Sequence, residues 1–424
     1  MFSTLRNAWK IPEMRKRMVF TLLMLLVIRL GSSIPVPYMD KEIVKQVFEA
    51  GQGGLLQFLD IISGGTLSNF SIFALSIYPY ITASIIIQLL TIAIPRLEEL
   101  AKEGEEGRKR ISRYTRYGAV ILAFVQGIGT TFGLLGNAIV ADTPVQKAVV
   151  IISLVAGTTF LMWIGNLITE KGIGNGISLI IFIGIVSGLP STVISYVRLA
   201  MLGAINVVKL ILLAIVVVLV VAVVILLQEG ERRIPVQYAK RVVGRKMYGG
   251  QSTHIPLKVS MAGVIPVIFS TSLLAFPQTI TLFFLGRIPD WIIKYLTVQG
   301  SVGVWVYSIL NVLLIMFFTY FYTAVQFNTV EYAKNLQQYG GFIPGIRPGR
   351  PTSEYLNKVI TRLTFVGGLS LALIASLPII LSYLFKLNIN FGGTAVIIVV
   401  GVVLETVKQI EAELLMRNYK GFLK

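Results

Sequence analysis

The sequence predicts an all-α integral membrane protein with ten membrane-spanning helices, and three observations lead to this fold class. The chain of 424 residues is 55% hydrophobic and only 14% charged, and its mean hydropathy is +0.77. Long apolar stretches recur from one end to the other, and Lys and Arg gather in alternate connections between them. A soluble domain needs more charge than this to cover its surface, so the composition indicates the membrane class.

Ten apolar stretches are long enough to cross a bilayer, which takes about 20 residues of helix. Their approximate bounds are 19–37, 72–94, 117–139, 147–168, 176–193, 206–228, 259–285, 302–327, 363–385 and 391–409. The first ends in the sequence IPVP with no small-residue cleavage pattern behind it, so we expect a retained span and not a secretory signal. An even number of spans predicts that both termini lie on one side of the membrane.

The distribution of positive charge predicts which side this is. If both termini are cytoplasmic, 29 Lys and Arg lie in cytoplasmic segments and 8 in outer ones, with Arg29 inside the first span. This asymmetry predicts cytoplasmic termini by the positive-inside rule. The formal net charge of +18 also suits contact with anionic membrane lipids, nucleic acid or an acidic partner.

The ten spans divide into two halves of five, in residues 1–200 and 201–424. Because five is odd, two similar halves would insert with opposite topology, which is the inverted-repeat arrangement of many transport proteins. The halves share no convincing sequence similarity, so we expect this arrangement from topology alone.

One segment does not fit the simple pattern of spans. From Leu55 to Pro95 the chain is mostly apolar but too long for a single span, and Gly64-Gly65 interrupts it. The piece around the break, LLQFLDIISGGTLSNF, is short and amphipathic and carries Asp60, so it cannot cross a bilayer. Irregular chain at membrane depth has to pack within protein or line a wet cavity. We expect a re-entrant or interfacial segment, and an ordinary outer loop is the alternative.

The residues that the chain lacks exclude several kinds of chemistry. It has no Cys and one His, His254, in a basic loop, which excludes disulfides, thiolate catalysis and His/Cys metal sites. Within the apolar stretches and the broken segment, the acids are Asp60 and Glu405. Ion-coupled transporters usually need buried carboxylates, so a secondary transporter for small solutes is the weaker alternative. An intramembrane protease would need a Ser-His or paired-Asp site in the spans, so we expect no enzymatic activity and no cofactor.

The spans carry mild polarity instead of charge. Polar side chains occur in the second, third, seventh and eighth spans, and they include Gln88, Gln126, Ser270, Thr271, Ser272 and Asn311. Such residues commonly form hydrogen bonds between membrane helices. The functional alternative is a seam that can open, because weak polar pairs separate more easily than tight apolar packing.

Two cytoplasmic loops combine positive charge with aromatic residues. Loop 229–258 carries seven cations and two acids, and loop 328–362 also mixes Lys and Arg with Tyr and Phe between Gly-Pro turns. Both patterns are typical of structured loops, and basic aromatic surfaces suit phosphate backbones or an acidic protein face. The simpler alternative is that these charges only fix the topology.

Several long motifs follow one another through nearly the whole chain, from about Met14 to Tyr419: SGGTLSNFSIFALSIYPYITASIIIQLL (63–90), EGRKRISRYTRYG (106–118), ITEKGIGNGISLIIF (168–182), ERRIPVQYAKR (231–241), STHIPLKVSMAGVIP (252–266), GGFIPGIRPG (340–349) and FGGTAVIIVV (391–400). Together they resemble the SecY family, whose members form the channel of the bacterial translocon. Val243 and Lys246 stand where relatives often have Arg or Gln, which puts no role in doubt.

The resemblance implies an hourglass of ten helices in two inverted halves around a central pore. Segment 60–71 would be the plug helix that closes the outer funnel, with Asp60, Ile61, Ile62, Ser63, Gly64, Gly65, Thr66, Leu67, Ser68 and Asn69. The pore ring would consist of Ile77, Ile81, Ile177, Ile181, Ile268 and Ile398. A lateral gate, between the second and third spans and the seventh and eighth, would include Gln88, Gln126, Asn175 and Thr271.

The implied function is a passive, gated protein-conducting channel in the cytoplasmic (inner) membrane. Unfolded preproteins would cross through the centre, and the hydrophobic segments of nascent membrane proteins would leave sideways into lipid. SecA or the translating ribosome would supply the energy and dock on the basic loops through Arg245, Lys246 and Arg347. SecE and SecG would complete the complex, and YidC and SecDF would be further partners.

Overall fold

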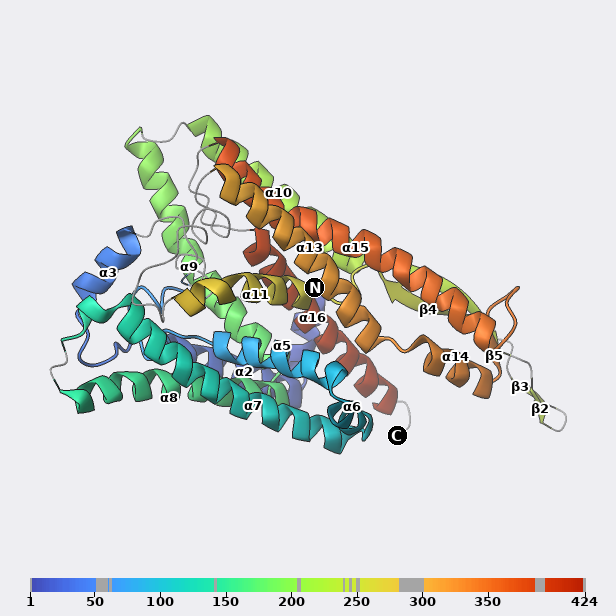
Figure 1. Cartoon of the computed structure of the whole chain (residues 1–424). Coiled ribbons are helices and arrows are strands. Elements are labelled where there is room, and N and C mark those ends of the chain that lie inside the picture. Colours follow the sequence, from blue (N-terminus) through green and yellow to red (C-terminus); the bar gives the residue numbers. More distant parts are fainter. Residues whose placement is uncertain are drawn as a thin grey trace.

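The fold is mostly helical, with a small β-sheet at one end of the molecule (Figure 1). The computed structural model describes residues 2–50, 60, 63–140, 143–203, 207–238, 241–243, 246–248, 252–281, 301–385 and 393–421. The expectation of a purely α-helical chain therefore needs correction, because the basic loop 229–258 contains strands.

The N-terminal half holds eight of the helices that the structure describes. They are α1 (Phe2–Lys10), α2 (Pro12–Gly31), α3 (Lys41–Ala50), α5 (Tyr78–Ala93), α6 (Pro95–Lys102), α7 (Glu105–Ile128), α8 (Pro144–Lys171) and α9 (Gly176–Met201). A π-helical turn, η1 (Gly129–Leu134), and a 3₁₀ turn, η2 (Gly136–Ala138), follow α7. Pro occupies the first turn of α2, α5, α6 and α8, where its missing N–H costs no helical hydrogen bond.

The C-terminal half combines long helices with the strands. Its described helices are α10 (Val207–Glu229), α11 (Ile265–Thr281), α13 (Ser301–Gln326), α14 (Thr329–Gln338), α15 (Arg350–Phe385) and α16 (Gly393–Gly421). Its strands are β1 (Glu231–Tyr238), β2 (Arg241–Val243), β3 (Lys246–Tyr248), β4 (Ser252–Lys258) and β5 (Gly341–Phe342). Thus both basic loops contribute ordered elements, as their sequences predict.

Each of the ten predicted spans overlaps one described helix, but fewer meet a strict test of length and apolarity. Among the described residues, four helices are long and apolar enough to cross a membrane: Pro144–Lys171, Gly176–Arg198, Gly303–Gln338 and Arg350–Leu377. The bent pair α5 and α6, at 100° to each other, would make a fifth if it counts as one span. The chain is therefore a multi-pass membrane protein, and the count of ten spans stays a prediction.

The small sheet joins the two basic loops. Its strand order is β4-β1-β5, and both pairings are antiparallel, with Ile234 opposite Ile255 and Gln237 opposite Phe342. Strand β1 buries alternate residues, Ile234 and Val236, as expected for a strand with one face on a core. That core includes Leu336 of α14 and residues of α15, so the sheet is fixed on the ends of the long helices.

Close helix packing in the N-terminal half depends on glycine. A Cβ atom on Gly176 of α9 would collide with the carbonyl oxygen of Gly165 on α8, and one on Gly157 would collide with the carbonyl oxygen of Ile72. In lipid the hydrophobic effect does not drive helices together, so their association depends on close packing. Small residues allow helix backbones to approach closely enough for this packing. Gly157, Gly165 and Gly176 thereby bring α8 against α9 and against the chain that leads into α5.

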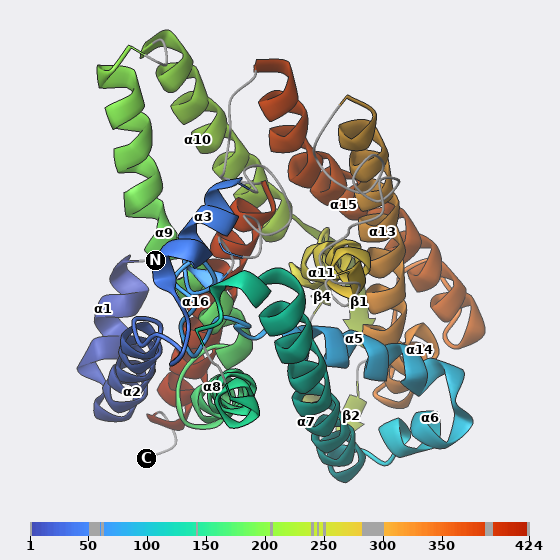
Figure 2. The ribbon, with the colours of Figure 1, turned by 60° about the vertical axis from the view of Figure 1, so that its left-hand side comes forward.

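The helices converge on one apolar cluster at the centre of the molecule. It takes residues from α2, α5, α8, α9, α11, α13 and α16, that is, from both halves. Figure 2 looks nearly along α11, which contacts α5 on one side and α13 on the other. Helices α5 and α11 thus meet at the boundary between the halves.

Candidate functional site

All six isoleucines of the predicted pore ring lie in this one cluster. Ile77, Ile81, Ile181 and Ile398 are buried, with exposed fractions of 0%, 6%, 2% and 1%. Ile177 and Ile268 are half-buried and pack against them. We call these six residues the central cluster.

Four helices position the central cluster. Ile77 and Ile81 lie at the start of α5, Ile177 and Ile181 at the start of α9, Ile268 on α11 and Ile398 on α16. A spacing of four places each pair on one helical face. Branched apolar side chains offer no hydrogen bond to a passing molecule, and an apolar constriction resists ions by dewetting.

The predicted plug segment, residues 60–71, forms a compact series of turns beside this centre. Ile61 and Ile62 lie outside the described residues. The carboxylate of Asp60 accepts a hydrogen bond of 2.8 Å from the backbone N–H of Ser68, and the backbone N–H of Gly65 donates to the Asp60 carbonyl oxygen at 2.9 Å. Burial raises the pKa of the Asp60 carboxyl, and the hydrogen bonds from Ser68 oppose that rise. The segment therefore has its own internal hydrogen-bond network.

Polar and apolar contacts hold the plug segment in place. The Thr66 hydroxyl lies 3.1 Å from the carbonyl oxygen of Phe73 and 3.2 Å from that of Ser63. Leu67 and Phe70 are buried in a second apolar cluster with residues of α7 and α8. Replacement of Gly64 would meet the Gly184 carbonyl oxygen and the Ser187 hydroxyl at 2.7 Å, so the segment also contacts α9 closely.

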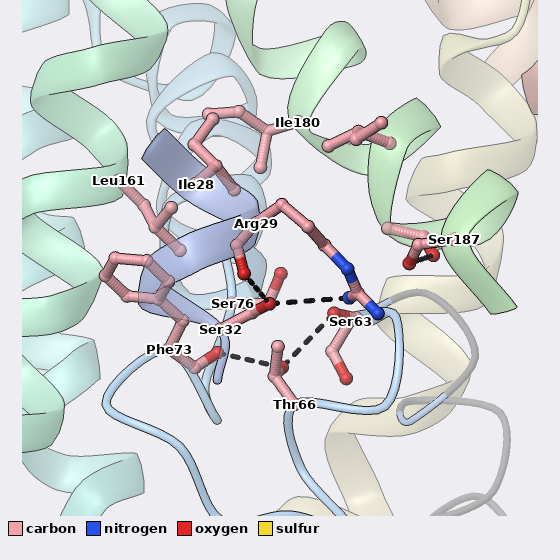
Figure 3. A pocket seen from close by; sticks show the side chains of 12 residues that line it. Ile28, Arg29, Ser32, Ser63, Thr66, Phe73, Ser76, Leu161, Ile180 and Ser187 are labelled. Atoms are coloured by element: carbon pink, nitrogen blue, oxygen red, sulfur yellow. Dashed lines mark hydrogen bonds between the residues drawn. The ribbon is translucent and has the colours of Figure 1, made fainter. Parts of the chain in front are cut away.

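Arg29 connects α2 to the plug segment. Its Nη1 donates to the Gly64 carbonyl oxygen at 3.1 Å. It also donates to the Ser32 hydroxyl at 3.4 Å, a bond drawn in Figure 3. The Ser32 hydroxyl in turn donates to the carbonyl oxygen of Arg29 at 2.6 Å. Side chains of Ser63, Thr66 and Ser76 line the same pocket.

A basic cavity of about 300 Å³ adjoins this pocket and shares Arg29 and Ser32 with it. Arg29, Lys41 and Lys45 line it, together with Gly65 and Asn69 of the plug segment. The predicted topology places this cavity on the outer side of the membrane.

The predicted gate residues lie on several helices. The Gln88 side chain on α5 donates to the Ser84 hydroxyl at 3.3 Å, and the backbone carbonyl of Gln126 on α7 accepts from the Thr130 hydroxyl. The Thr271 hydroxyl on α11 donates to the backbone carbonyl of Val267. These bonds all stay within one helix or its continuation. Asn175 accepts from the N–H groups of Ile177 and Ser178 and thus caps the start of α9, outside the four helices of the predicted gate.

Other hydrogen bonds of α11 connect it to neighbouring helices. The Ser270 hydroxyl donates to the Asn311 side-chain oxygen on α13 at 2.7 Å, within the C-terminal half. The Tyr78 hydroxyl donates to the Ser272 carbonyl oxygen at 2.7 Å, which joins α5 to α11 across the boundary between the halves.

Two of these contacts could not be identified from the sequence. The sequence does not identify the partner of Tyr78, because a tyrosine in a membrane span can have many different roles. Arg29 does carry a signal, since a cation inside a span is costly and usually functional, but its partner Gly64 is 35 residues away.

The predicted docking residues lie at the sheet end of the molecule. Arg347 is exposed in the turn between β5 and α15, and its carbonyl oxygen accepts from Thr352 at 2.9 Å. Lys246 belongs to β3, and Arg245 lies outside the described residues. The part of the chain that the structure describes contains no group of three or more His, Asp or Glu that could hold a metal ion.

These features define the class of the protein: a mostly helical multi-pass membrane protein whose two halves meet around one apolar centre. The SecY family model matches residues 71–407. The chain is 47% identical to the protein translocase subunit SecY of Halalkalibacterium halodurans over 438 residues, with 100% of both chains covered. It belongs to the SecY family.

Solved structures support the same fold. One, of a protein-conducting channel, matches 94% of this chain and 92% of its own with a TM-score of 0.69 and 20% identity. Another, Sec61 in the canine ribosome–channel complex from the endoplasmic reticulum, has the same coverage, a TM-score of 0.65 and 19% identity. At these identities the likeness concerns the fold alone.

Proposed function

We propose that this chain forms a gated protein-conducting channel, the channel subunit of a protein translocase, and performs no bond chemistry. The observation that carries the proposal is the central cluster, in which helices of both halves bring six isoleucines into one apolar cluster. The relative from Halalkalibacterium halodurans is named a protein translocase subunit, and the match covers the whole length of both chains. This similarity supports the same role here. The route of the polypeptide would pass through the central cluster.

Closure would involve two parts. The central cluster is the apolar constriction, and the plug segment blocks the outer side of it. This assignment is supported by the position of the plug segment between Arg29 and α9, and by Ser76, which lines the plug pocket next to Ile77 in sequence. Both parts would have to separate before a polypeptide passes.

Hydrophobic segments would leave sideways, between α5 and α7 on one side and α11 and α13 on the other. The α5–α11 contact is the place where the halves would separate. Gln88, Gln126 and Thr271 lie on this set of helices, whereas the capping role of Asn175 is an equally good reason for its presence.

Driving partners would dock at the sheet end. The sheet joins loops 229–258 and 328–362 into one structured basic surface, which suits a ribosome or an ATPase such as SecA. The Sec61 relative in a ribosome–channel complex supports the ribosome as one partner. SecE and SecG are proposed as companion subunits from the family, with the complex in the cytoplasmic membrane and both termini in the cytoplasm.

Site-specific crosslinking tests the channel directly, because the chain has no Cys of its own. Single cysteines at Ile81, Ile181 and Ile398 are expected to crosslink to a secretory chain stalled during transport. A cysteine at Leu219, an exposed position on α10, serves as the control and is expected not to react. Equal crosslinking at all four positions, or at none of them, would refute the proposed route.

A further inference from the structure

One hydrogen bond stands at the place where the two halves meet. The Tyr78 hydroxyl donates to the Ser272 carbonyl oxygen at 2.7 Å, an ideal length for such a bond. Tyr78 is the first residue of α5 and is half-buried, while Ser272 is buried on α11. The bond therefore joins a helix of the N-terminal half to one of the C-terminal half.

On α5, the donor Tyr78 is rigidly connected to Ile77 of the central cluster. Ile77 immediately precedes Tyr78, and its carbonyl oxygen accepts from the N–H groups of Tyr80 and Ile81 at 3.1 Å. These are the first hydrogen bonds of α5, so Ile77 and Tyr78 move with the helix.

On α11, the acceptor has the same relation to the central cluster. Ser272 lies four residues after Ile268, about one turn along the same helix, and its backbone carbonyl is fixed within α11. Any movement that separates α11 from α5 would thus part Ile77 from Ile268 and Tyr78 from Ser272 together. In addition, the Ser270 bond to Asn311 makes α13 move with α11.

The plug segment and the same short stretch of chain line one pocket. Ser76 lines the pocket that Ser63 and Thr66 of the plug segment also line (Figure 3). Its φ of 50° places it in the left-handed region, which an L-residue other than Gly adopts at a cost. Such strain is found where surrounding structure fixes the backbone, often at functional sites. Ser76, Ile77 and Tyr78 therefore lie at the plug pocket, the central cluster and the α5–α11 contact, in that order.

From this arrangement, we infer that the Tyr78 hydroxyl is a positioning group that holds the α5–α11 contact and the central cluster closed together. The inference rests on the proposed channel function. Loss of the bond shifts the closed–open equilibrium toward open by about two- to tenfold, the effect of one neutral hydrogen bond. A hydrophobic signal segment acts as a ligand of the channel and shifts this equilibrium only by its preference for the open state. Transport of a substrate with a weak signal segment should therefore increase most when the bond is lost.

The test compares Tyr78→Phe with the matched variant Tyr80→Phe in the complete channel complex in vesicles. Both remove one hydroxyl from α5. Tyr80 packs against the apolar cluster at the centre of the molecule as well as against Ala83, Ala119 and Met162, but it takes part in none of the hydrogen bonds that the structure describes between α5 and α11. Transport is measured for a normal secretory substrate and for one with a shortened hydrophobic signal segment. Tyr78→Phe is expected to raise transport of the weak substrate about two- to tenfold over the wild type. Tyr80→Phe is expected to match the wild type.

A second measurement does not depend on transport. Spin labels on Ile86→Cys and Leu273→Cys, both exposed, report the distance between α5 and α11 in the resting complex. Tyr78→Phe should broaden this distance distribution toward longer values, and Tyr80→Phe should not.

The outcomes separate the inference from the function on which it rests. If Tyr78→Phe carries the normal substrate but gives wild-type distances and wild-type transport of the weak one, the inference is wrong and the channel proposal stands. If the wild-type complex transports neither substrate, the proposed function fails, and the label distances alone then decide whether Tyr78 holds α5 to α11.

Discussion

At the residue scale, the sequence predicts that some residues of the central cluster share a helical face, but it does not predict that all six come together. Spacings of four in Ile77/Ile81 and Ile177/Ile181 predict two helical faces, but isoleucine in a span more often faces lipid or core. Only the family resemblance selected the six residues. Their convergence depends on how α5, α9, α11 and α16 pack, and that packing depends on close approaches such as that of Gly176 to Gly165.

The first prediction concerns this cluster. Changing Ile81, Ile181, Ile268 and Ile398 together to Ser should raise ion leak while protein transport persists, because polar side chains let water enter an apolar constriction. The control changes four exposed isoleucines, Ile152, Ile194, Ile215 and Ile309, to Ser. Single-channel recordings of the assembled complexes give the leak, and an equal leak in both variants would show that the cluster is not the seal.

The second prediction concerns Arg29, which holds the plug segment through the Gly64 carbonyl. Arg29→Met keeps most of the side-chain length but removes the donor. A hydrogen bond from a charged group is worth about 1.5–3 kcal/mol when it is buried and less where water has access. At the lower end of this range, resting ion leak should rise about tenfold. Lys41→Met removes a charge from the same basic cavity and should leave the leak unchanged. Equal conductance of Arg29→Met and wild type in planar bilayers would contradict this role.

At the element scale, hydropathy locates the membrane-crossing part of a helix but not the whole helix. Helix α7 begins at Glu105, twelve residues before the predicted span, since EEGRKRISRYTR is helical and too charged for lipid. Helix α16 likewise continues beyond 409 to Gly421. Helix α2 ends at Gly31, earlier than the apolar run, because the chain from Ser32 to Pro37 includes two prolines and pairs at Pro35 with Ser71.

The sheet was harder to predict than the helices. Strands β1 and β4 each contain a proline, Pro235 and Pro256, which normally weighs against a strand. The apolar positions of both strands are buried against α14 and α15, which a sequence pattern alone does not reveal. Sequence could indicate that the two basic loops are structured, but not that β1 and β5 pair across them.

The third prediction concerns this sheet end as a docking surface. Arg347→Glu should reduce SecA-driven translocation at least about tenfold, because a cation-to-acid change turns attraction into repulsion at a contact. Arg198→Glu, an exposed arginine on α9 that the topology places outside, is the control and should translocate normally. If the assembled Arg347→Glu complex translocates at the normal rate, Arg347 has no role in docking and contributes only to membrane topology.

At the scale of the whole molecule, the two halves are joined differently at two places. Helices α1 and α2 contact α16 through the cluster of Ala8, Met14, Ile173 and Ile410, and Arg17 pairs with Glu413 at 3.3 Å. Elsewhere, α5 meets α11 with the Tyr78 bond across the contact. The first junction combines apolar packing, an ion pair and the hydrogen bond from Thr4 to Glu411. The junction of α1 and α2 with α16 is thus held by charged and polar groups as well as by apolar packing.

The fourth prediction tests the topology on which these assignments depend. The asymmetry of 29 against 8 Lys and Arg predicts cytoplasmic termini, and the spans then alternate from that side. A reporter enzyme that is active only outside should therefore be active when fused after Leu202 or Gly300 and silent after Gly250 or Gly345. Immunoblots of equal fusion-protein amounts control for degradation. Activity after Gly250 would place the basic loop 229–258 outside, where neither a cytoplasmic ATPase nor a ribosome could reach it, and the docking assignment would fail with the topology.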